Sequence, residues 1–444
     1  MNKHSQPPER HRWFDDWRGA KGPALRKLVA DITAEVEALE RATGARKRSR
    51  KAVDQRHFEV AVEVVVSNLA HEVLVPSETG RLAILTGNGP KGATRYDNRA
   101  LGEPLRNLLG SLQELGLVDW QWTGERGVAS SLAPTAALSG RVREAGISMS
   151  TFGRIAGEET IILSTKLPIG GEGSGLQRRE RLDYPDTPDT MAMRAAVEAL
   201  NGFLADADIS FIKDGLRDVD TSERRMRRHF VVRAGAKGEA PPVSFDRGGR
   251  LFGGFWQNLP SSRRGGIRIN DEPVAELDYG QMAVRLAYAT VGAPPPEGDM
   301  YAIPGLEGHR AAVKTAFNTL LNAGPKMTRW GYERAGNGED ADASERLPAG
   351  WTVKRTRAAI LDRHPALASC LGSGIGLKLM HMESEILVAV LMEMVRRGVV
   401  GLGIHDGLLT QASKAAEVRQ IMEKTALVKA GAEIPVSVEP FSLC

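Results

Sequence analysis

Two aspartates stand where apolar, β-like runs of the sequence end. The first run, VAELDYGQMAVR, occupies residues 274–285 and contains Asp278; the second, VVGLGIHDGLLT, occupies residues 399–410 and contains Asp406. A buried strand that ends in a carboxylate holds that carboxylate rigidly at the rim of a sheet, and two such strands side by side make a site for divalent metal. The pair therefore predicts the carboxylates of a phosphoryl-transfer site that acts on a nucleotide.

Each aspartate also has a local explanation that needs no metal. Asp278 precedes the helix-like segment GQMAVRLAY and could serve as the N-cap of that helix. Asp406 is followed by Gly407, and Asp-Gly is a strong signal for a hairpin turn. Neither alternative accounts for the other motifs that surround the two residues.

These motifs occur in a fixed order along the second half of the chain. They are GRL at 249–251, QNLP at 257–260, DYGQMAVR at 278–285, Arg310-x-x-x-Lys314 and IHD at 404–406. The ordered set resembles the family A DNA polymerases, which include bacterial DNA polymerase I and, more distantly, the phage-type single-subunit RNA polymerases. In that family GRL and QNIP precede motif A (DYSQIELR), motif B begins with R-x-x-x-K, and motif C is VHDE or HDS. The resemblance covers roughly residues 245–440.

The resemblance implies a Mg²⁺-dependent, template-directed nucleotidyltransferase, either a DNA polymerase or a primase-polymerase. Asp278 and Asp406 would bind two Mg²⁺ ions, for which Mn²⁺ can substitute, to activate the primer 3′-hydroxyl and neutralise the triphosphate. The main-chain carbonyl of Tyr279 would be a further oxygen ligand. Arg310 and Lys314 lie four residues apart on one predicted helix face, where both would meet the triphosphate. Lys314 would also supply a proton to the pyrophosphate leaving group.

The resemblance implies further contacts with nucleotide and DNA. Arg250 and Gln257 would approach the minor groove of the primer-template end and test the shape of the base pair; a tight turn and a core edge are the alternatives. Phe317 would stack on the incoming base, although the family more often has its aromatic residue where Asn318 stands. His405 would orient the backbone of the metal site or contact the primer end, and a structural role is its alternative.

The sequence departs from the family at the sugar pocket. Ala283 stands five residues after Asp278, where the family has a glutamate whose bulk excludes the ribose 2′-hydroxyl. A small residue removes that obstruction, so acceptance of ribonucleotides, as in RNA polymerases or primases, is a second interpretation. Asn322-Ala323 replace Tyr-Gly at the end of motif B, and Gly407 follows the motif C aspartate in place of Glu or Ser. No segment resembles a proofreading exonuclease, so we expect a trimmed palm and fingers without proofreading.

Length and composition bound the class of protein. A chain of 444 residues is long enough for two or three domains, and 42% hydrophobic with 26% charged residues is ordinary for a folded soluble protein. Cys370 and Cys444 are the only cysteines, which excludes a disulfide framework and a cysteine-based zinc site. No stretch approaches the roughly 18 apolar residues of a membrane span, and the N-terminus lacks a signal-peptide core. We expect a cytoplasmic protein without a membrane partner.

The positive charges are bunched although the net charge is only +4. Residues 46–51 read RKRSRK and residues 224–228 read RRMRR. Such runs favour a polyanionic partner such as nucleic acid, and solvated surface charge is the alternative for each of them.

The pattern of the N-terminal half predicts a module that binds DNA. A helix at 98–115, a strand at 117–122, a Gly-containing loop at 123–127 and a returning strand at 128–133 follow the order of a winged-helix domain. The outer face of the predicted recognition helix would offer Arg99, Arg106 and Asn107 to DNA. Winged helices also serve as protein–protein modules, which is the alternative.

The expected fold class is α+β: a right-hand polymerase palm with a small antiparallel sheet and helical fingers, preceded by a mostly helical N-terminal region with a winged-helix-like module. The predicted parts are a helical basic segment at 1–52, the winged-helix-like domain at 53–150, a linker and thumb-like helical region at 151–244, and the palm and fingers at 245–444. Residues 336–350 are predicted to form a mobile loop in the fingers.

DNA template, DNA primer and nucleoside triphosphates are the expected partners. The fusion of a DNA-binding module to a palm is typical of replication or priming for a mobile element. Two other hypotheses remain open from the sequence: a replication initiator or defence protein whose palm only binds nucleic acid, and a nucleotidyltransferase that needs no template.

Overall fold

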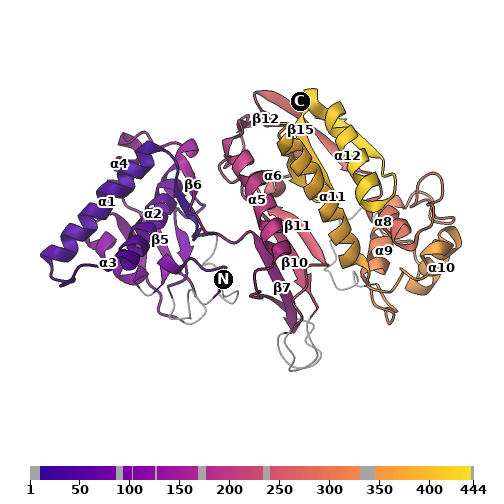
Figure 1. Ribbon diagram of the computed structural model, residues 1–444, viewed down its shortest axis with the longest axis horizontal. Coiled ribbons are helices and arrows are strands. Elements are labelled where there is room, and N and C mark those ends of the chain that lie inside the picture. Colours follow the sequence, from indigo (N-terminus) through magenta and orange to yellow (C-terminus); the bar gives the residue numbers. More distant parts are fainter. Residues whose placement is uncertain are drawn as a thin grey trace. The chain divides into compact units, whose positions relative to one another are not determined.

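The computed structural model describes residues 11–86, 94–102, 104–125, 128–168, 177–233, 241–330 and 346–441. The chain forms two compact units: an N-terminal unit of Met1–Thr160 with Lys213–Arg224, and a C-terminal unit of Ile161–Ile212 with Arg225–Cys444. Both units combine helices with small sheets, so the chain is of the mixed α+β class (Figure 1). Within the described part of the chain, every helix is too short or too polar to cross a lipid bilayer.

The N-terminal unit is organised around two long helices. Its elements are β1 (Arg12–Trp13), β2 (Arg18–Ala20), α1 (Pro23–Ala42), α2 (Ala52–Leu74), β3 (Leu82–Ile84), η1 (Arg99–Leu101), α3 (Leu105–Glu114), β4 (Val118–Gln121), β5 (Ser130–Pro134), α4 (Ala136–Glu144), η2 (Met149–Thr151) and β6 (Phe152–Arg154). Leu25, Leu28, Ile32 and Val36 recur at helical spacing on α1 and are all buried in one core with residues of α2. The predicted segment 1–52 is therefore not a separate part, because it shares this core with the segment that follows it.

The region predicted as a winged helix has most of the expected elements. The strands β4 and β5 form an antiparallel pair, and β3 pairs with β5 on its other edge, in a sheet of order β1-β3-β5-β4. The predicted helix 98–115 is interrupted, because Pro104 has no backbone N–H to continue a helix from η1 into α3. Residues 126–127 of the predicted loop lie outside the described residues.

The two arginines predicted to contact DNA do not share one helix face. Arg99 is exposed on η1, whereas Arg106 lies on α3. The Nε atom of Arg106 donates a hydrogen bond to the main-chain oxygen of Thr86 at 2.6 Å, and its guanidinium carbon lies 6.0 Å from the Trp122 ring centroid. A role of either arginine in DNA binding stays a prediction.

The basic run at 46–51 is partly engaged within the N-terminal unit. Arg46 and Arg50 both form ion pairs with Glu40 of α1, at 3.4 and 2.6 Å. The guanidinium of Arg50 also lies 3.5 Å from the centroid of the Phe58 ring. These two arginines therefore have intramolecular partners, which favours the alternative of structural charge at their positions.

Residues 213–224 return from the C-terminal unit to the N-terminal unit. Asp220 lies in this segment, and its Oδ2 atom is 2.5 Å from Nε2 of His71, which is 2% exposed. Burial lowers the pKa of His71, and Arg12 lies 2.9 Å from the other ring nitrogen. This contact joins two residues that are far apart in the sequence, and it places residues 213–224 in the N-terminal unit.

The C-terminal unit contains two sheets and the helices that pack on them. Its elements are β7 (Ile161–Pro168), β8 (Gln177–Arg181), α5 (Pro188–Asp206), β9 (Ile209–Phe211), β10 (Met226–Val232), β11 (Gly248–Gly253), α6 (Phe255–Asn258), α7 (Ser261–Arg264), β12 (Ile267–Ile269), β13 (Glu272–Tyr279), α8 (Met282–Val291), α9 (Arg310–Asn322), α10 (Val353–Arg363), η5 (Pro365–Leu367), α11 (Gly376–Arg396), β14 (Leu402–Ile404), β15 (Gly407–Gln411), η6 (Ala412–Lys414), α12 (Ala415–Ala430) and β16 (Val436–Pro440).

The region 151–244 differs from the prediction of a thumb-like helical region. Its described residues form the strands β6 to β10 and one helix, α5, and they include the basic run at 224–228. Residues of β10 alternate between buried and half-buried, and Arg228 is 2% exposed because its guanidinium pairs with Glu385 of α11 at 2.6 Å. Met226 and Arg228 of this run are therefore buried, and Arg228 is not available to a polyanionic partner.

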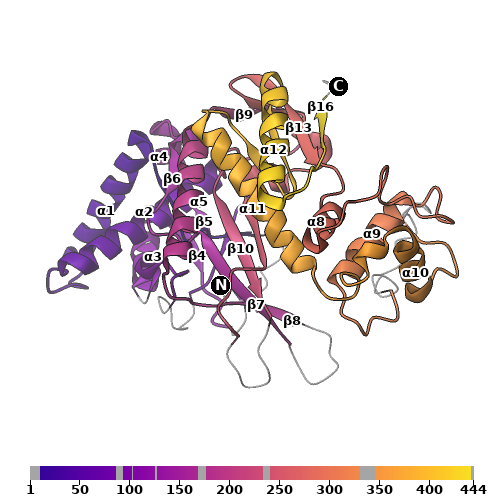
Figure 2. The ribbon, with the colours of Figure 1, turned by 45° about the vertical axis from the view of Figure 1, so that its right-hand side comes forward.

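A small antiparallel sheet carries two of the motifs: Asp278 lies on β13, and IHD spans the end of β14 and the turn that follows it. Strand β13 lies at its centre and pairs with β15 along one edge and with β16 along the other, and β12 and β14 extend the sheet through hairpins. Figure 2 shows β13 and β16 together beside α12, with α8, α9 and α10 forming a helical group next to the sheet. Helix α11 runs across β11 and packs against α8 and α12. Residues 336–345, most of the predicted mobile loop at 336–350, lie outside the described residues.

Candidate active site

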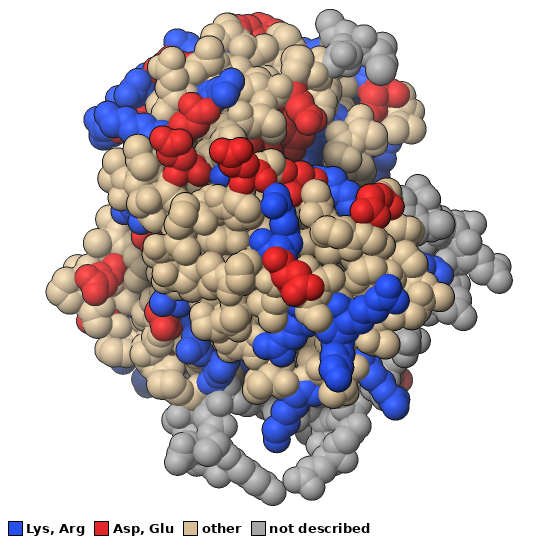
Figure 3. All heavy atoms as spheres, turned by 90° about the vertical axis from the view of Figure 1, so that its right-hand side faces the viewer, with Lys and Arg blue, Asp and Glu red and all other residues tan. Residues whose placement is uncertain are grey.

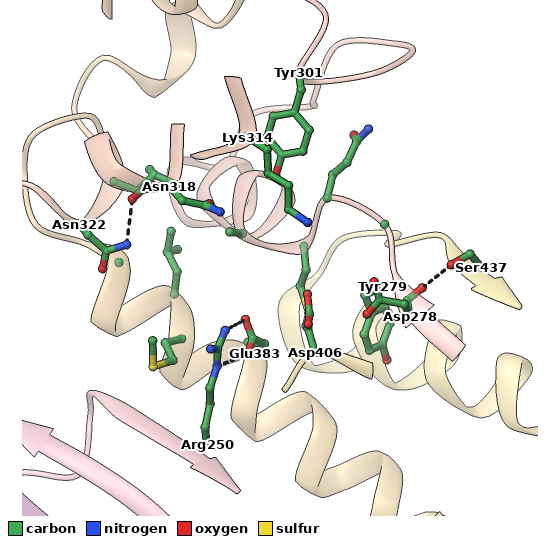
Figure 4. Close-up of a pocket in the computed structure, with 18 of the residues that line it drawn as sticks. Arg250, Asp278, Tyr279, Tyr301, Lys314, Asn318, Asn322, Glu383, Asp406 and Ser437 are labelled. Atoms are coloured by element: carbon green, nitrogen blue, oxygen red, sulfur yellow. Dashed lines mark hydrogen bonds and ion pairs between the residues drawn. The ribbon is translucent and has the colours of Figure 1, made fainter. Parts of the chain in front are cut away.

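A cavity of about 580 Å³ lies in the C-terminal unit between the motif-bearing sheet and the helices α8, α9 and α11 (Figure 4). The residues predicted from the sequence that line it are Arg250, Asp278, Tyr279, Ala283, Arg310, Lys314 and Asp406. Gln257, Phe317 and His405 were predicted to belong to the same site but do not line the cavity.

Asp278 is presented to the cavity by the alternation of strand β13. The side chains of Leu277 and Tyr279 point into the core and are 0% and 2% exposed, so that Asp278 between them lies on the opposite face. The hydroxyl of Tyr279 donates to the main-chain oxygen of Met422 at 2.6 Å, which fixes its ring away from the cavity. The N-cap alternative for Asp278 is excluded, because α8 begins at Met282 and its N-cap position is Gln281, which makes no side-chain capping hydrogen bond.

Asp406 occupies the turn of the hairpin that joins β14 to β15. Ile404 pairs with Gly407 across this turn, and His405 has a φ of 53°, in the left-handed region. The hairpin alternative was therefore correct as a local description, and the same turn lines the cavity. Strand β15 then pairs with β13 so that Gly407 lies directly opposite Asp278. This register makes the two aspartates neighbours.

The electrostatics of the pair suit a bound cation. Removal of water by the surrounding protein and, after it, the neighbouring charge of Asp406 together raise the pKa of Asp278 to about 7. Two carboxylates placed together in this way repel each other unless a proton or a cation is present. A positive charge bound between them would remove that repulsion.

A divalent cation held by oxygen fits this donor set. In the described part of the chain, no group of three or more His, Cys, Asp or Glu side chains is arranged to hold a metal. Mg²⁺ commonly uses only one or two carboxylates of the protein and takes its other ligands from water and substrate phosphates. Asp278 and Asp406 with the main-chain oxygen of Tyr279 would supply such a set.

Gly407 explains one departure from the family pattern. A Cβ atom at this position would lie 2.5 Å from the carbonyl oxygen of Leu277 and 2.8 Å from Oδ1 of Asp278. Both distances are too short for a real contact, so a side chain here would displace the first aspartate. Glycine is thus required by the close approach of β15 to β13.

We expect Gly407→Ala to lower both stability and activity. Overpacking against Leu277 and Asp278 should cost about 1–3 kcal/mol of unfolding free energy, measured by denaturant titration. Gly202→Ala is the matched control, since a Cβ atom in that position of α5 meets nothing within 4 Å and should leave stability equal or slightly higher. Equal stability and activity of Gly407→Ala and the wild type would contradict the register described here.

Helix α9 brings the predicted cations to the cavity. Arg310, Lys314, Asn318 and Asn322 follow one another at four-residue intervals and all line it. Figure 4 shows the Lys314 side chain extending from α9 toward the two aspartates, and its charge opposes the rise in the pKa of Asp278. Among the described residues Lys314 has no ion-pair partner, which leaves its ammonium group available to a phosphate.

Arg310 is held at the mouth of the cavity by Asp299. Its Nε and Nη2 atoms donate to the two carboxylate oxygens at 2.7 and 3.2 Å, and Asp299 also accepts a hydrogen bond from Gln281 at 2.6 Å. The guanidinium carbon lies 5.3 Å from the centroid of the Tyr301 ring. Arg310 has an exposed side chain, so its exchange from Asp299 to an anionic ligand carries a small cost.

Phe317 is a correction to the predicted nucleotide site. Its side chain is 0% exposed and packs edge-on against Tyr301 and His364, with ring centroids 6.1 and 5.3 Å apart. A ring that is enclosed on all sides has no face for a base to stack on. Tyr301 is an aromatic residue that lines the cavity and that the sequence analysis did not identify.

Arg250 lines the cavity but has an intramolecular partner. Its Nε and Nη2 atoms donate to Oε1 and Oε2 of Glu383 at 2.6 and 2.9 Å, in a two-pronged ion pair that Figure 4 shows. Burial raises the pKa of Glu383, and the bonds from Arg250 oppose that rise. Glu383 is, like Tyr301, a lining residue that the sequence analysis did not identify.

The two remaining predicted DNA contacts lie outside the cavity. The amide of Gln257 is used within the protein, because its Nε2 atom donates to the main-chain oxygen of Gly403 at 2.8 Å. This bond supports the structural alternative, a core edge. His405 is exposed at the hairpin turn, and burial of part of its ring lowers its pKa. Contacts of these residues with DNA stay predictions.

Comparisons with known proteins add little to this description. No family model matches the chain, and no curated protein matches it. Among solved structures the chain is similar to the POL domain of Pol1 from M. smegmatis in complex with DNA primer-template and dNTP, with a TM-score of 0.32 and 10% sequence identity. The similarity covers 95% of this chain and 66% of that one, just under two thirds of its length. A likeness at this level carries no conclusion on function, which rests on the residues of the cavity.

Proposed function

We propose that the protein is a divalent-metal-dependent, template-directed nucleotidyltransferase of the family A type, a DNA polymerase or primase-polymerase. One observation carries this proposal: Asp278 at the end of β13 and Asp406 in the turn just before β15 become neighbours through the pairing of these two strands. Both line a cavity that Lys314 and Arg310 of α9 line as well. Paired carboxylates opposite two cations are the arrangement that transfer of a nucleotide from a triphosphate requires.

Each residue has a separate task in the proposed reaction. Asp278 and Asp406 would hold two Mg²⁺ ions, or Mn²⁺ in their place, and these ions would supply activation of the primer 3′-hydroxyl and neutralisation of the triphosphate. Lys314 would bind the triphosphate and donate a proton to the departing pyrophosphate. Arg310 would leave Asp299 and bind phosphate oxygens in the two-pronged way that it now binds a carboxylate.

The surface charge of the C-terminal unit supports a nucleic-acid partner. Figure 3 shows Lys and Arg side chains gathered on one half of a face of this unit, with Asp and Glu side chains near the hollow that crosses it. Lys354 and Arg355 of helix α10 are exposed. A basic surface beside an acidic metal site suits a phosphate backbone that is held near the site but outside the metal ligands.

The N-terminal unit is proposed to locate DNA for this reaction. Its β4–β5 hairpin carries Trp122, which is 61% exposed, and Arg106 lies beside that ring. An exposed aromatic ring next to a cation suits stacking and phosphate contact in nucleic-acid binding. Replication or priming for a mobile element would be the setting in which such a module finds a start site and the C-terminal unit extends the strand.

The proposal is tested by strand synthesis on defined templates. The purified protein is incubated with Mg²⁺ or Mn²⁺ and with dNTPs or NTPs, separately, on primed and unprimed single-stranded DNA. Products whose sequence follows the template are expected. Products that do not depend on the template would favour the template-independent alternative, and no product under any condition would favour the purely binding alternative.

Lys314→Ala should weaken the use of nucleotide without loss of the fold. Removal of an ammonium group that contacts the triphosphate should lower kcat/KM by roughly 10²–10⁴-fold. Thr315→Ala, one residue further along α9, is a matched control because Thr315 is exposed and does not line the cavity. Steady-state incorporation of a single nucleotide measures both, and equal values for both variants would remove Lys314 from the reaction.

A further inference from the structure

The ion pair between Arg250 and Glu383 has no task in the proposed reaction. Glu383 is 4% exposed, and both of its oxygens accept hydrogen bonds from Arg250. Such a pair is a weak source of stability, because the loss of water around two charges offsets their attraction. The carboxylate nevertheless forms part of the cavity wall, where a ligand would meet it.

The wall around Glu383 has the character of a sugar site. Helix α11 presents Leu379 and Met380 to the cavity together with Glu383, and helix α8, which packs against α11, presents Ala283. The side chain of Ala283 ends at its Cβ atom and leaves space beside this wall. An apolar wall with one fixed acceptor suits a ring that has apolar faces and hydroxyl groups at its edge.

Glu383 retains acceptor capacity toward that space. An ionised carboxylate has about four lone-pair positions, and Arg250 occupies two of them. The two bonds from Arg250 also fix the orientation of the carboxylate, so that it does not have to be ordered when a ligand arrives. A hydroxyl group that donates to one of the remaining positions would form a strong, charge-assisted hydrogen bond.

We propose that Glu383 accepts a hydrogen bond from the 2′-hydroxyl of the incoming nucleotide, and that the cavity therefore selects ribonucleoside triphosphates. This inference rests on the proposed nucleotidyl transfer. The small side chain of Ala283 leaves room for the 2′-hydroxyl, and Glu383 adds a positive preference for that hydroxyl. A deoxyribonucleotide would lack the donor and lose one charge-assisted bond.

The first test uses nucleotides that separate size from hydrogen bonding. Incorporation of NTPs, dNTPs and 2′-fluoro-2′-deoxynucleoside triphosphates by the wild-type protein is compared as kcat/KM. Fluorine fills the space of the hydroxyl but cannot donate, so the fluoro nucleotides should behave like dNTPs, roughly tenfold or more below NTPs. Equal use of NTPs and fluoro nucleotides would overturn the inference, as would a preference of the wild type for dNTPs.

The second test changes the acceptor itself. Glu383→Gln replaces the charged acceptor facing the sugar by an amide, so the ratio of kcat/KM for NTPs to that for dNTPs should fall about tenfold, chiefly through KM for NTPs. Glu385→Gln is the matched control, because Glu385 lies on the same helix, is also paired with an arginine, and does not line the cavity. An unchanged ratio in Glu383→Gln would contradict the proposed contact.

The outcomes distinguish this inference from the proposed function. Template-directed synthesis without discrimination between NTPs and fluoro nucleotides would retain nucleotidyl transfer and reject the contact with Glu383. Absence of synthesis by the wild type with every nucleotide would reject the proposed function. If Glu383→Gln does not fold, as judged by circular dichroism, the comparison of nucleotides on the wild type decides the matter alone.

Discussion

Asp406→Asn will abolish nucleotide incorporation while leaving the fold and DNA binding intact. A metal-ligating carboxylate contributes several kcal/mol to stabilisation of the transition state, so the rate should fall by at least about a thousandfold. Asparagine has the same shape and is well tolerated in turns, so the hairpin between β14 and β15 should persist. Single-nucleotide incorporation and a DNA-binding isotherm measure the two effects separately.

Asp271→Asn provides the matched control for this prediction. Asp271 lies in the corresponding turn of the hairpin between β12 and β13, has a φ of 60°, and does not line the cavity. The same chemical change there should leave incorporation near the wild-type rate. A rate of nucleotide incorporation by Asp406→Asn within a factor of about ten of that of the control would contradict the proposed role of Asp406.

Asp278→Asn will stabilise the metal-free protein above pH 7 and abolish the proposed nucleotide incorporation. The pKa of the folded-state carboxyl is raised from 3.8 to about 7 by burial and by Asp406. Between these values the folded state binds more protons than the unfolded state, so stability falls as pH rises from about 4 to about 7. Asparagine has no charge to develop and avoids this loss.

The gain in stability should depend on pH and on metal. Because the Asp278 carboxylate is open to the cavity, solvent screens part of its unfavourable charge. We expect the substitution to raise the free energy of unfolding by roughly 1–2 kcal/mol, or the Tm by a few degrees, at pH 8. At pH 4 the variant and the wild type should unfold at similar temperatures in EDTA. Added Mg²⁺ should raise the Tm of the wild type at pH 8 more than that of the variant. A lower Tm for Asp278→Asn at pH 8 would contradict the repulsion between the aspartates.

The two aspartates that line the cavity could be predicted from sequence because their signals are local and ordered. Apolar runs that end at Asp278 and Asp406 indicate strand ends, and the order of the motifs between them indicates that the strands meet. The register that puts Gly407 opposite Asp278 has no such local signal. It depends on strand pairing between segments far apart in the chain.

Helical spacing along α9 separates the predicted residues that line the cavity from Phe317, which does not line it. Arg310, Lys314 and Asn318 form a stripe at four-residue intervals that lines the cavity. Phe317 belongs instead to the apolar stripe of Val313 and Leu320, and all three are buried. The helical spacing of these three apolar residues therefore indicates a position in the core for Phe317, although it lies only three residues from Lys314.

Glu383 and Arg228 were missed for the same physical reason. Glu383 follows Leu379 on one face of α11 at helical spacing, and an acidic residue within an apolar stripe indicates a buried charge with a partner. Arg228 lies within a basic run that suggested exposed surface. The partners of both residues, Arg250 and Glu385, are far away in the chain, so neither ion pair could be inferred from local sequence.

Binding of Mn²⁺, measured by electron paramagnetic resonance on the wild type, Asp278→Asn, Asp406→Asn and the control Asp271→Asn, tests the central claim most directly. It reports on the two aspartates as metal ligands without requiring the full reaction, and it can be repeated with a nucleoside triphosphate present. We predict binding by the wild type and the control that each of the other substitutions weakens at least about tenfold. Equal Mn²⁺ affinity in all four proteins would contradict a metal site formed by Asp278 and Asp406.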